Sequence, residues 1–397
     1  MRLYNTLTRA VDDVELGRDV SLYVCGVTPY DTTHVGHART YLVFDVLVRH
    51  LVHVGHRVHY VQNVTDVDDS ILARAAQLGV SYEELHRRYT AIYFEDVAAL
   101  GMVPASAYPT ASSGIEEIKE VIERLLRSGH AYEVDGDVYF RVARARSYGD
   151  LSRLRRDDML RIEAGQDGTT IDDPRKEDAL DFPLWKAARP GEPTWDSPWG
   201  PGRPGWHIEC STLALKHIGP RVDVHGGGAD LVYPHHECEI AQSEAVTGTR
   251  PFARAWMHVA MVLLGGRKMS KSDGNLVFVR DLLEKHTADA LRLYLLSTHY
   301  RTELDFDEDE LRACGERAAL VAEAARAAGG RGDGDATDAV ERVDAALADD
   351  LDTPAAVAAV EGLARAVVDD ARAGRPVRAR RRALARAAAR LGLQLAG

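Results

Sequence analysis

The segment Lys268 to Ser272 reads Lys-Met-Ser-Lys-Ser and follows a glycine pair, Gly265 and Gly266. A lysine ammonium is a compact charge on a flexible stem, and a serine hydroxyl can donate to a phosphate oxygen. The glycines allow the backbone to turn sharply. The pattern predicts a loop that contacts a polyphosphate and stabilises the negative charge that develops on it during a reaction. Lys268 and Lys271 would be its catalytic residues. For an isolated pair of lysines, the alternative is a solvated basic turn.

Two histidines near the N-terminus, His34 and His37, lie where a strand is expected to give way to a helix. Residues 21–25 form an apolar strand pattern, and residues 36–51 have the apolar spacing of an amphipathic helix. A helix N-terminus favours anions, and Gly36 allows a nucleotide to approach the backbone closely. We therefore expect His34, Gly36 and His37 to bind the phosphates of a nucleotide. Alone, such histidines are more often surface or capping residues. The loop at 268–272 in the same chain strengthens the interpretation that they bind phosphate.

The two motifs together resemble the signatures of class I aminoacyl-tRNA synthetases, and their surroundings resemble the cysteinyl-tRNA synthetase family. The resemblance extends from residue 3 to about residue 310, and it includes a related ligase of the mycothiol pathway that joins cysteine to an amino sugar. The segments that carry it are Leu3–Thr8, Tyr23–Gly26, Asn63–Asp69, Gly205–Cys210, His225–Gly228 and Pro234–Glu237.

The expected fold is α/β, with a doubly wound, mainly parallel nucleotide-binding sheet, an inserted mixed domain and a C-terminal helical bundle. A strand at 22–25, a helix at 40–53 and a strand at 58–62 favour the parallel sheet, because such crossovers join parallel strands. We expect another strand at 255–264. By the resemblance, residues 1–100 and 205–310 form the two halves of the catalytic domain. Residues 101–204 form a connective insertion, and 311–397 form the bundle, with no separate anticodon-binding domain.

The composition, 45% hydrophobic and 28% charged, is typical of a soluble globular protein. No run approaches the roughly 18–20 apolar residues of a membrane span, and no secretory segment is recognisable. We expect a cytoplasmic monomer without membrane contact. The four cysteines are far apart in sequence, which argues against a disulfide framework.

A net charge of −12 is unusual for a protein that binds nucleic acid, because phosphates are neutralised mainly by lysine and arginine. Seven arginines lie between Arg375 and Arg390, and they predict either a local basic face or a solvated helix face. If the partner is tRNA, then Arg380, Arg381 and Arg382 are candidate phosphate contacts.

The resemblance also implies a zinc site with two sulfur ligands, one nitrogen and one oxygen, a set that suits one Zn²⁺ per chain. His235 and Glu239 are one helical turn apart, whereas His236 and Cys238 are expected to lie on another face. Individually, such cysteines are more often core residues, and such histidines are more often on the surface. Zinc would separate cysteine from serine, because it binds a thiolate far better than a hydroxyl. The expected ligands are Cys25, Cys210, His235 and Glu239.

The implied reaction is activation of L-cysteine by ATP, which arrives with Mg²⁺, followed by transfer to the 3′ end of tRNA(Cys). Trp206 and His225 would line the cysteine pocket, and Gly228 and Asp230 would lie near the adenosine. The alternative acceptor is the amino sugar glucosaminyl-inositol. A third reading, an inactive paralogue that acts as a binding module, is disfavoured because the motif histidines and lysines are intact.

Three aspartates lie within the segment from Asn63 to Asp69, after the expected strand at 58–62. Their spacing does not match a calcium-binding loop. We therefore favour helix capping and substrate orientation over a magnesium or calcium site.

Overall fold

The computed structural model describes residues 1–166, 170–269, 274–330 and 337–395. Its centre is a parallel sheet with the strand order β10–β9–β3–β4. The four strands are β3 (Asp19–Val27), β4 (Arg57–Val64), β9 (Val222–Gly228) and β10 (Ala253–Val259). The order runs outward in both directions from the β3–β9 pair, which is the doubly wound arrangement expected from the sequence.

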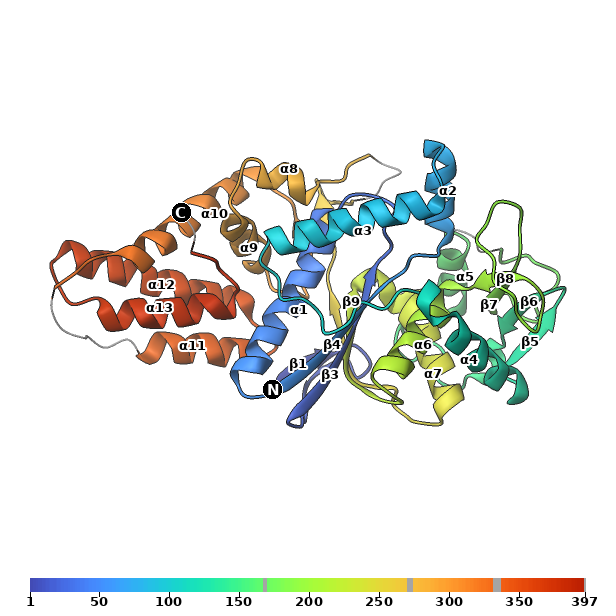
Figure 1. Cartoon of the computed structure of the whole chain (residues 1–397). Helices are drawn as coiled ribbons and strands as arrows, with labels where there is room; N and C mark the ends of the chain where they lie inside the picture. Colours follow the sequence, from blue (N-terminus) through green and yellow to red (C-terminus); the bar gives the residue numbers. More distant parts are fainter. Residues whose placement is uncertain (167–169, 270–273, 331–336, 396–397) are drawn as a thin grey trace.

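Both faces of this sheet are covered by helices, as Figure 1 shows. Helix α1 (Val35–His53) covers one face, and α6 (Trp206–His217) with α7 (Glu237–Thr247) lies on the other. Leu22 and Val24 of β3 pack into the core with α1, whereas Tyr23 and Cys25 pack into the core that contains Cys210 of α6. This alternation follows from the two-residue period of a strand, and it places the Cys25 thiol on the α6 face.

An antiparallel sheet with its own helices is inserted between the halves of the parallel sheet. Its strand order is β5–β6–β7–β8, and a separate apolar cluster forms its core. Asp69 links it to the central domain, since it accepts hydrogen bonds from Lys186 Nζ and from Arg203 at 2.6 Å each. Helices α2 (Asp69–Leu78) and α3 (Tyr82–Ala99) precede the insertion. The elements of the insertion are α4 (Ile115–Arg127), β5 (Ala131–Val134), β6 (Asp137–Phe140), α5 (Arg156–Glu163), β7 (Phe182–Ala187) and β8 (Gly202–Pro204).

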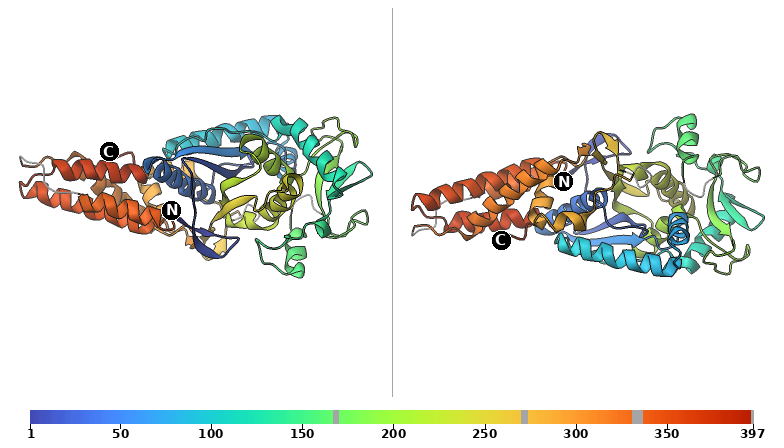
Figure 2. Two further views of the ribbon diagram at one scale, coloured as in Figure 1. Left: turned by 90° about the horizontal axis from the view of Figure 1, so that it is seen from below. Right: turned by 90° about the horizontal axis from the view of Figure 1, so that it is seen from above.

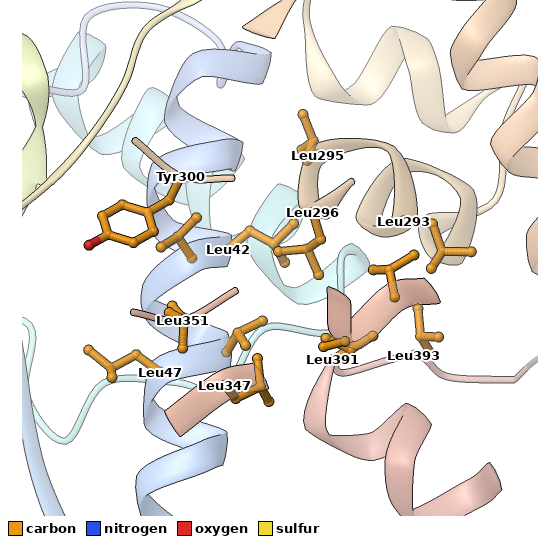
Figure 3. Packing of buried hydrophobic residues seen from close by; sticks show 14 of the residues in the cluster. Leu42, Leu47, Leu293, Leu295, Leu296, Tyr300, Leu347, Leu351, Leu391 and Leu393 are labelled. Carbon is orange, nitrogen blue, oxygen red and sulfur yellow. The ribbon is translucent and has the colours of Figure 1, made fainter. Parts of the chain in front are cut away.

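A helical bundle occupies the opposite end of the elongated molecule from the insertion (Figure 2). Its helices are α10 (Glu308–Arg326), α11 (Thr337–Ala348), α12 (Thr353–Arg372) and α13 (Arg378–Arg390), and α8 (Val279–Leu283) and α9 (Ala288–Leu296) precede them. One apolar cluster is continuous from the central sheet through α1 and α9 into this bundle. Figure 3 shows Leu42 and Leu47 of α1 beside Leu296, Leu347 and Leu391.

The strand expected at 255–264 is interrupted at Ala260 and Met261, so that part of the prediction is wrong. Strand β10 ends at Val259, and β11 (Val262–Leu264) joins a small sheet with β12 (Arg267–Lys268) and β13 (Leu304–Asp305). The physical reason is that the main chain at Ala260 and Met261 bonds outside the sheet, to Arg39 and to the turn after α9. A short hairpin of β1 (Arg2–Asn5) and β2 (Ala10–Asp13), which the sequence did not predict, precedes the central sheet.

Candidate active site

A cavity of about 450 Å³ lies at the carboxyl ends of the parallel strands. In open α/β sheets this edge is where ligands bind. Met261, Met269 and Leu276 give one side of the cavity an apolar wall. Six residues that were predicted to bind ATP or to act in catalysis line the cavity, namely His34, Gly36, His37, Gly228, Asp230 and Lys268.

His34 is the N-cap of α1, and its ring serves as the capping group. Nδ1 accepts hydrogen bonds from the amides of Gly36 at 3.1 Å and His37 at 3.4 Å. Because Nδ1 is an acceptor, the neutral ring carries its proton on Nε2, which makes that nitrogen a donor. The His37 ring stacks on His34 with a centroid distance of 3.7 Å. The prediction that the two histidines begin a helix after a strand is confirmed, and capping and ligand contact are compatible roles.

Both rings are neutral near pH 7. Burial, assisted by the neighbouring His37, lowers the pKa of His34 to about 2, and burial lowers the pKa of His37 to about 4. A neutral imidazole can donate from one nitrogen while it accepts at the other, which is the state that the N-cap geometry of His34 requires. Near pH 7 these rings can therefore donate a hydrogen bond, but they carry no fixed positive charge.

The low pKa values predict how stability depends on pH. Between pH 6.5, the ordinary value for histidine, and about pH 4, the unfolded chain binds a proton at His37 that the folded chain does not bind. The free energy of unfolding should therefore decrease as the pH falls through this window. Denaturant unfolding at several pH values measures the slope, and His37→Gln should make it shallower. An unchanged slope in that variant would contradict the prediction.

Lys268 lies at the mouth of the cavity, where Nζ is 3.3 Å from Asp230 Oδ2. Both side chains are largely exposed, so the ion pair is weak and can exchange for a phosphate contact. Lys271, the other predicted catalytic lysine, lies outside the described residues.

The four predicted metal ligands converge on one buried position. One ligand atom from each lies within 4.8 Å of the others, and all four residues are buried. The Cys25 thiol donates to Glu239 Oε1 at 3.2 Å, and His235 Nε2 is 3.1 Å from the same oxygen, which confirms the expected one-turn spacing. These residues come from β3, α6, the turn before α7, and α7 itself: Cys25, Cys210, His235 and Glu239.

The protonation states of this group favour a cation. Burial opposes the charged form of Cys210, but the hydrogen bond with Cys25 and the nearby His235 lower its pKa to about 6. Burial also opposes the charged form of His235, but its contacts with Cys210 and Glu239 raise its pKa to about 10. Although burial works against it, the contacts with His225 and His235 hold the pKa of Glu239 well below its usual range. Cys210 and Glu239 thus offer sulfur and oxygen donors that favour their anionic forms, and the donor set fits zinc.

A second layer of histidines supports the donors. His225 Nε2 is 2.9 Å from Glu239 Oε2, and His207 Nδ1 is 3.0 Å from His235 Nδ1. Metal ligands usually have such partners, which fix their orientation. His225 does not line the cavity itself, whereas Trp206 does, with its ring 4.4 Å from that of His235. The roles of Trp206 and His225 in a cysteine pocket stay predictions. The position of His225 favours a role in which it contacts Glu239 rather than the substrate.

The expectation that His236 lies away from the site is wrong. His236 Nε2 is 3.3 Å from Cys25 Sγ. His236 precedes Glu239 by three residues, a spacing that also brings two side chains together on a helix, and its Nε2 lies 3.8 Å from Glu239 Oε1. Cys238, the other residue set aside, is not a member of either potential metal group among the described residues, and its Sγ lies 3.6 Å from the hydroxyl of Tyr148.

Thr6 and His258 also reach this site, although neither was predicted as a site residue. Thr6 lies in the segment Leu3–Thr8, which carries part of the family resemblance. Thr6 Oγ1 is 2.7 Å from His258 Nδ1, and His258 Nε2 is 2.7 Å from His236 Nδ1. Alternation along β10 could have revealed His258. Met257 packs on the α1 side of the sheet, and Trp256 packs on the α6 side, so His258 shares the face of the cysteines.

Of the three aspartates between Asn63 and Asp69, one caps a helix, as the sequence predicts, and the other two form contacts that the sequence did not predict. Substrate orientation stays a prediction. Asp68 caps α2 by accepting from the Ser70 amide at 2.8 Å. Asp66 accepts from the Ser112 amide, and Asp69 binds the insertion. No metal group among the described residues includes them.

A parallel sheet with a histidine-capped helix and a lysine at one cavity defines the catalytic domain of a class I aminoacyl-tRNA synthetase. In agreement, LeuRS from Agrobacterium radiobacter K84, solved in a ternary LeuRS-tRNA-LeuAMS complex, superposes with a TM-score of 0.67. The match covers 97% of this chain and 85% of that chain at 13% identity, and it therefore shows a shared fold. Residues 12–316 match the family described as tRNA synthetases class I (C) catalytic domain, and the chain belongs to that family.

Two relatives show how far the similarity extends. A cysteine–tRNA ligase of Pelotomaculum thermopropionicum is 51% identical over 319 residues, which are 79% of this chain and 64% of that protein. An L-cysteine:1D-myo-inositol 2-amino-2-deoxy-alpha-D-glucopyranoside ligase of Thermobispora bispora is 46% identical over 379 residues. That match covers 94% of this chain and 92% of the relative. The chain thus spans 64% of the first protein and nearly all of the second.

Proposed function

We propose that this protein activates L-cysteine with ATP and transfers the cysteinyl group to the 3′ end of tRNA(Cys). The observation that carries the proposal is that a buried, thiol-containing group of four potential metal ligands lies at the same cavity as the His34-capped helix and Lys268. One end of the cavity suits a thiol substrate, and the other suits a nucleotide. Relatives with this family's catalytic domain include cysteine–tRNA ligases.

In the first step, a carboxylate oxygen of cysteine attacks the α-phosphorus of ATP, and pyrophosphate leaves with its Mg²⁺. In the second, a hydroxyl of the tRNA 3′ end attacks the activated carbonyl, and AMP leaves. No protein nucleophile is needed. His34 and His37 would donate to the phosphates, Lys268 and Lys271 would stabilise charge on the departing pyrophosphate, and Gly36 would allow close approach. Gly228 and Asp230 would lie beside the adenosine.

We further propose one zinc ion per chain, held by Cys25, Cys210, His235 and Glu239. When bound, zinc would favour a thiol ligand over a hydroxyl, which separates cysteine from serine. Trp206 would close the cysteine pocket beside His235, and His225 would hold Glu239 in place. The proposal assigns the protein to the cytoplasm, where it would act as a monomer. Among the described residues, no helix is both long and apolar enough to cross a bilayer.

A second candidate function is ligation of cysteine to glucosaminyl-inositol. It is favoured by the near end-to-end match with the Thermobispora bispora ligase, which covers 92% of that protein. Both functions share the activation step and differ only in the acceptor.

The deciding experiment supplies ATP and labelled cysteine with either total tRNA or glucosaminyl-inositol. The first proposal predicts label on tRNA, and label on the sugar with uncharged tRNA would establish the second candidate. Cysteine-dependent exchange of pyrophosphate into ATP tests the shared activation step separately, and its absence would refute both functions.

The bundle offers a further test of the acceptor. Four of the seven arginines between Arg375 and Arg390 are engaged internally. Arg375 and Arg380 pair with Asp370, Arg381 donates to the Ala325 carbonyl, and Arg390 pairs with Asp344. The other three are exposed, lie four residues apart on α13, and have no hydrogen bond or ion pair from their side chains within the described ranges: Arg378, Arg382 and Arg386. Of the earlier candidates for phosphate contact, only Arg382 belongs to this exposed set.

We expect the triple substitution Arg378→Gln, Arg382→Gln and Arg386→Gln to weaken tRNA binding and to flatten its salt dependence. Each lost phosphate contact should reduce the logarithmic slope by roughly 0.7–0.9. The matched control replaces Arg375, Arg380 and Arg381, which removes the same charge from side chains that already have partners within the protein. Binding titrations at several salt concentrations compare the two variants. Equal slopes in both would show that net charge, rather than this surface, governs binding.

A further inference from the structure

Arg39 lies on α1 two residues after His37, and no part of its side chain reaches solvent. Burial lowers its pKa to about 10, so the guanidinium remains charged at neutral pH. Among the described residues, no carboxylate pairs with it, and its hydrogen bonds go to main-chain carbonyls. An unpaired buried charge is costly, and an arginine in this position requires an explanation.

The guanidinium joins two segments of backbone. One terminal nitrogen donates to the carbonyls of Ala260 at 3.1 Å and Met261 at 3.3 Å. The other donates to the carbonyls of His299 at 3.0 Å and Thr302 at 2.7 Å. The planar fork of arginine can hold both pairs at once, and the three donors of a lysine ammonium cannot reproduce that geometry.

Ala260 and Met261 are the residues at which the expected strand is interrupted, and both line the cavity. Their neighbours on that side, Val262, Met269 and Leu276, are apolar. His34 and Lys268 lie at the polar part of the same cavity. A purine base has flat apolar faces and a polar edge, so the wall around Ala260 and Met261 suits the base, and the polar part suits the phosphates.

The second segment is itself anchored. The Ala260 amide donates to the Tyr300 carbonyl at 2.7 Å, and the Leu304 amide donates to the Met261 carbonyl at 3.1 Å. The Tyr300 hydroxyl and Arg301 Nε in turn bond Asp350, between α11 and α12, at 2.6 Å and 2.8 Å. Arg39 therefore ties the cavity wall to a turn that is fixed to the bundle.

We propose that Arg39 is a positioning residue for the nucleotide base, because it holds the Ala260–Met261 backbone at the interruption between β10 and β11 and so sets the wall against which the base lies. This inference rests on the proposed use of ATP. Arg39 does not touch the phosphates in this arrangement, so its loss should change recognition of the base and leave binding of pyrophosphate unchanged.

The test measures equilibrium binding of ATP and GTP, without cysteine, to the full-length protein and to Arg39→Lys and Arg39→Met. We expect the dissociation constant for ATP to rise about tenfold or more in Arg39→Met, with a smaller rise in Arg39→Lys, as expected from the loss of well-aligned hydrogen bonds to a charged group. The preference for ATP over GTP should shrink, and the dissociation constant for pyrophosphate, measured in the same way, should stay the same.

Arg292→Met is the matched control. Arg292 is also fully buried, and it donates to the carbonyls of Leu100 and Leu391 as well as to Asp45, none of which lines the cavity. It should lose stability and keep ATP binding. Equal weakening of ATP and pyrophosphate binding, or the same ATP defect in both methionine variants, would overturn the inference. If Arg39→Met fails to fold, Arg39→Lys decides, and unchanged base preference in it would also refute the inference. Binding without cysteine separates this result from the activation test, which judges the proposed function.

Discussion

His34→Asn is expected to fold normally and to lose most of its capacity for cysteine-dependent pyrophosphate exchange. Asparagine is a strong N-cap residue, and its Oδ1 can accept from the same amides that now donate to Nδ1 of His34. It cannot place a donor where the ring presents Nε2. Loss of one preorganised donor to developing charge typically reduces turnover by about 10²–10³-fold, which we expect here.

His34→Ala provides the comparison for this experiment. It removes the cap as well as the donor, so exchange should fall as far as in His34→Asn, and the free energy of unfolding should fall by a further ~1 kcal/mol. Denaturant melts and exchange assays on both variants separate the two roles. If His34→Asn kept near-normal turnover, His34 would be only a capping residue.

Cys210→Ser should produce a folded protein that no longer retains zinc and no longer activates cysteine. Serine keeps nearly the same volume, but its hydroxyl is not a thiolate at neutral pH, whereas the pKa of Cys210 is lowered to about 6. Loss of an outer partner of a metal ligand typically costs about 10–100-fold in affinity, and loss of a ligand should cost more. Metal analysis of the purified protein and pyrophosphate exchange are the two measurements.

Cys238→Ser is the control for this substitution. It makes the same change at a second fully buried cysteine, which lies on α7 and outside both potential metal groups. Zinc content should stay near that of the parent protein. A metal-free parent protein that is fully active would refute zinc as the selector, and zinc loss in both variants would point to a general packing defect.

The group of four potential metal ligands illustrates how much the sequence can predict about this protein. Cys25 lies in a strand whose alternation decides which face it occupies, and His235 and Glu239 are one turn apart, so local periodicity combined with the family resemblance sufficed. His236 illustrates the limit. It lies three residues before Glu239 and contacts both Glu239 and Cys25. Neighbours at three and at four residues both meet on a helix, so spacing alone could not exclude His236 from the site.

The interrupted strand at Ala260 and Met261 shows a second limit, one of long-range contacts. The apolar run from 255 to 264 favours an unbroken strand. The break depends on a guanidinium that lies 221 residues away in sequence and on the Tyr300 carbonyl. Contacts of this kind form only once α1 and α9 have packed together, so a pattern confined to one segment cannot reveal them.

Helix α1 belongs equally to the nucleotide site and to the core of the bundle. Its first turn carries His34 and His37, and its later turns bury Leu42, Leu47 and Leu51 in the apolar cluster that continues into α11, α12 and α13. Within the described residues, one apolar cluster joins α1 to the bundle. We therefore expect the bundle and the first turn of α1 to melt in one cooperative step. A cavity made far out in the bundle would then lower the fraction of molecules in the catalytically competent state, without any change at the active site.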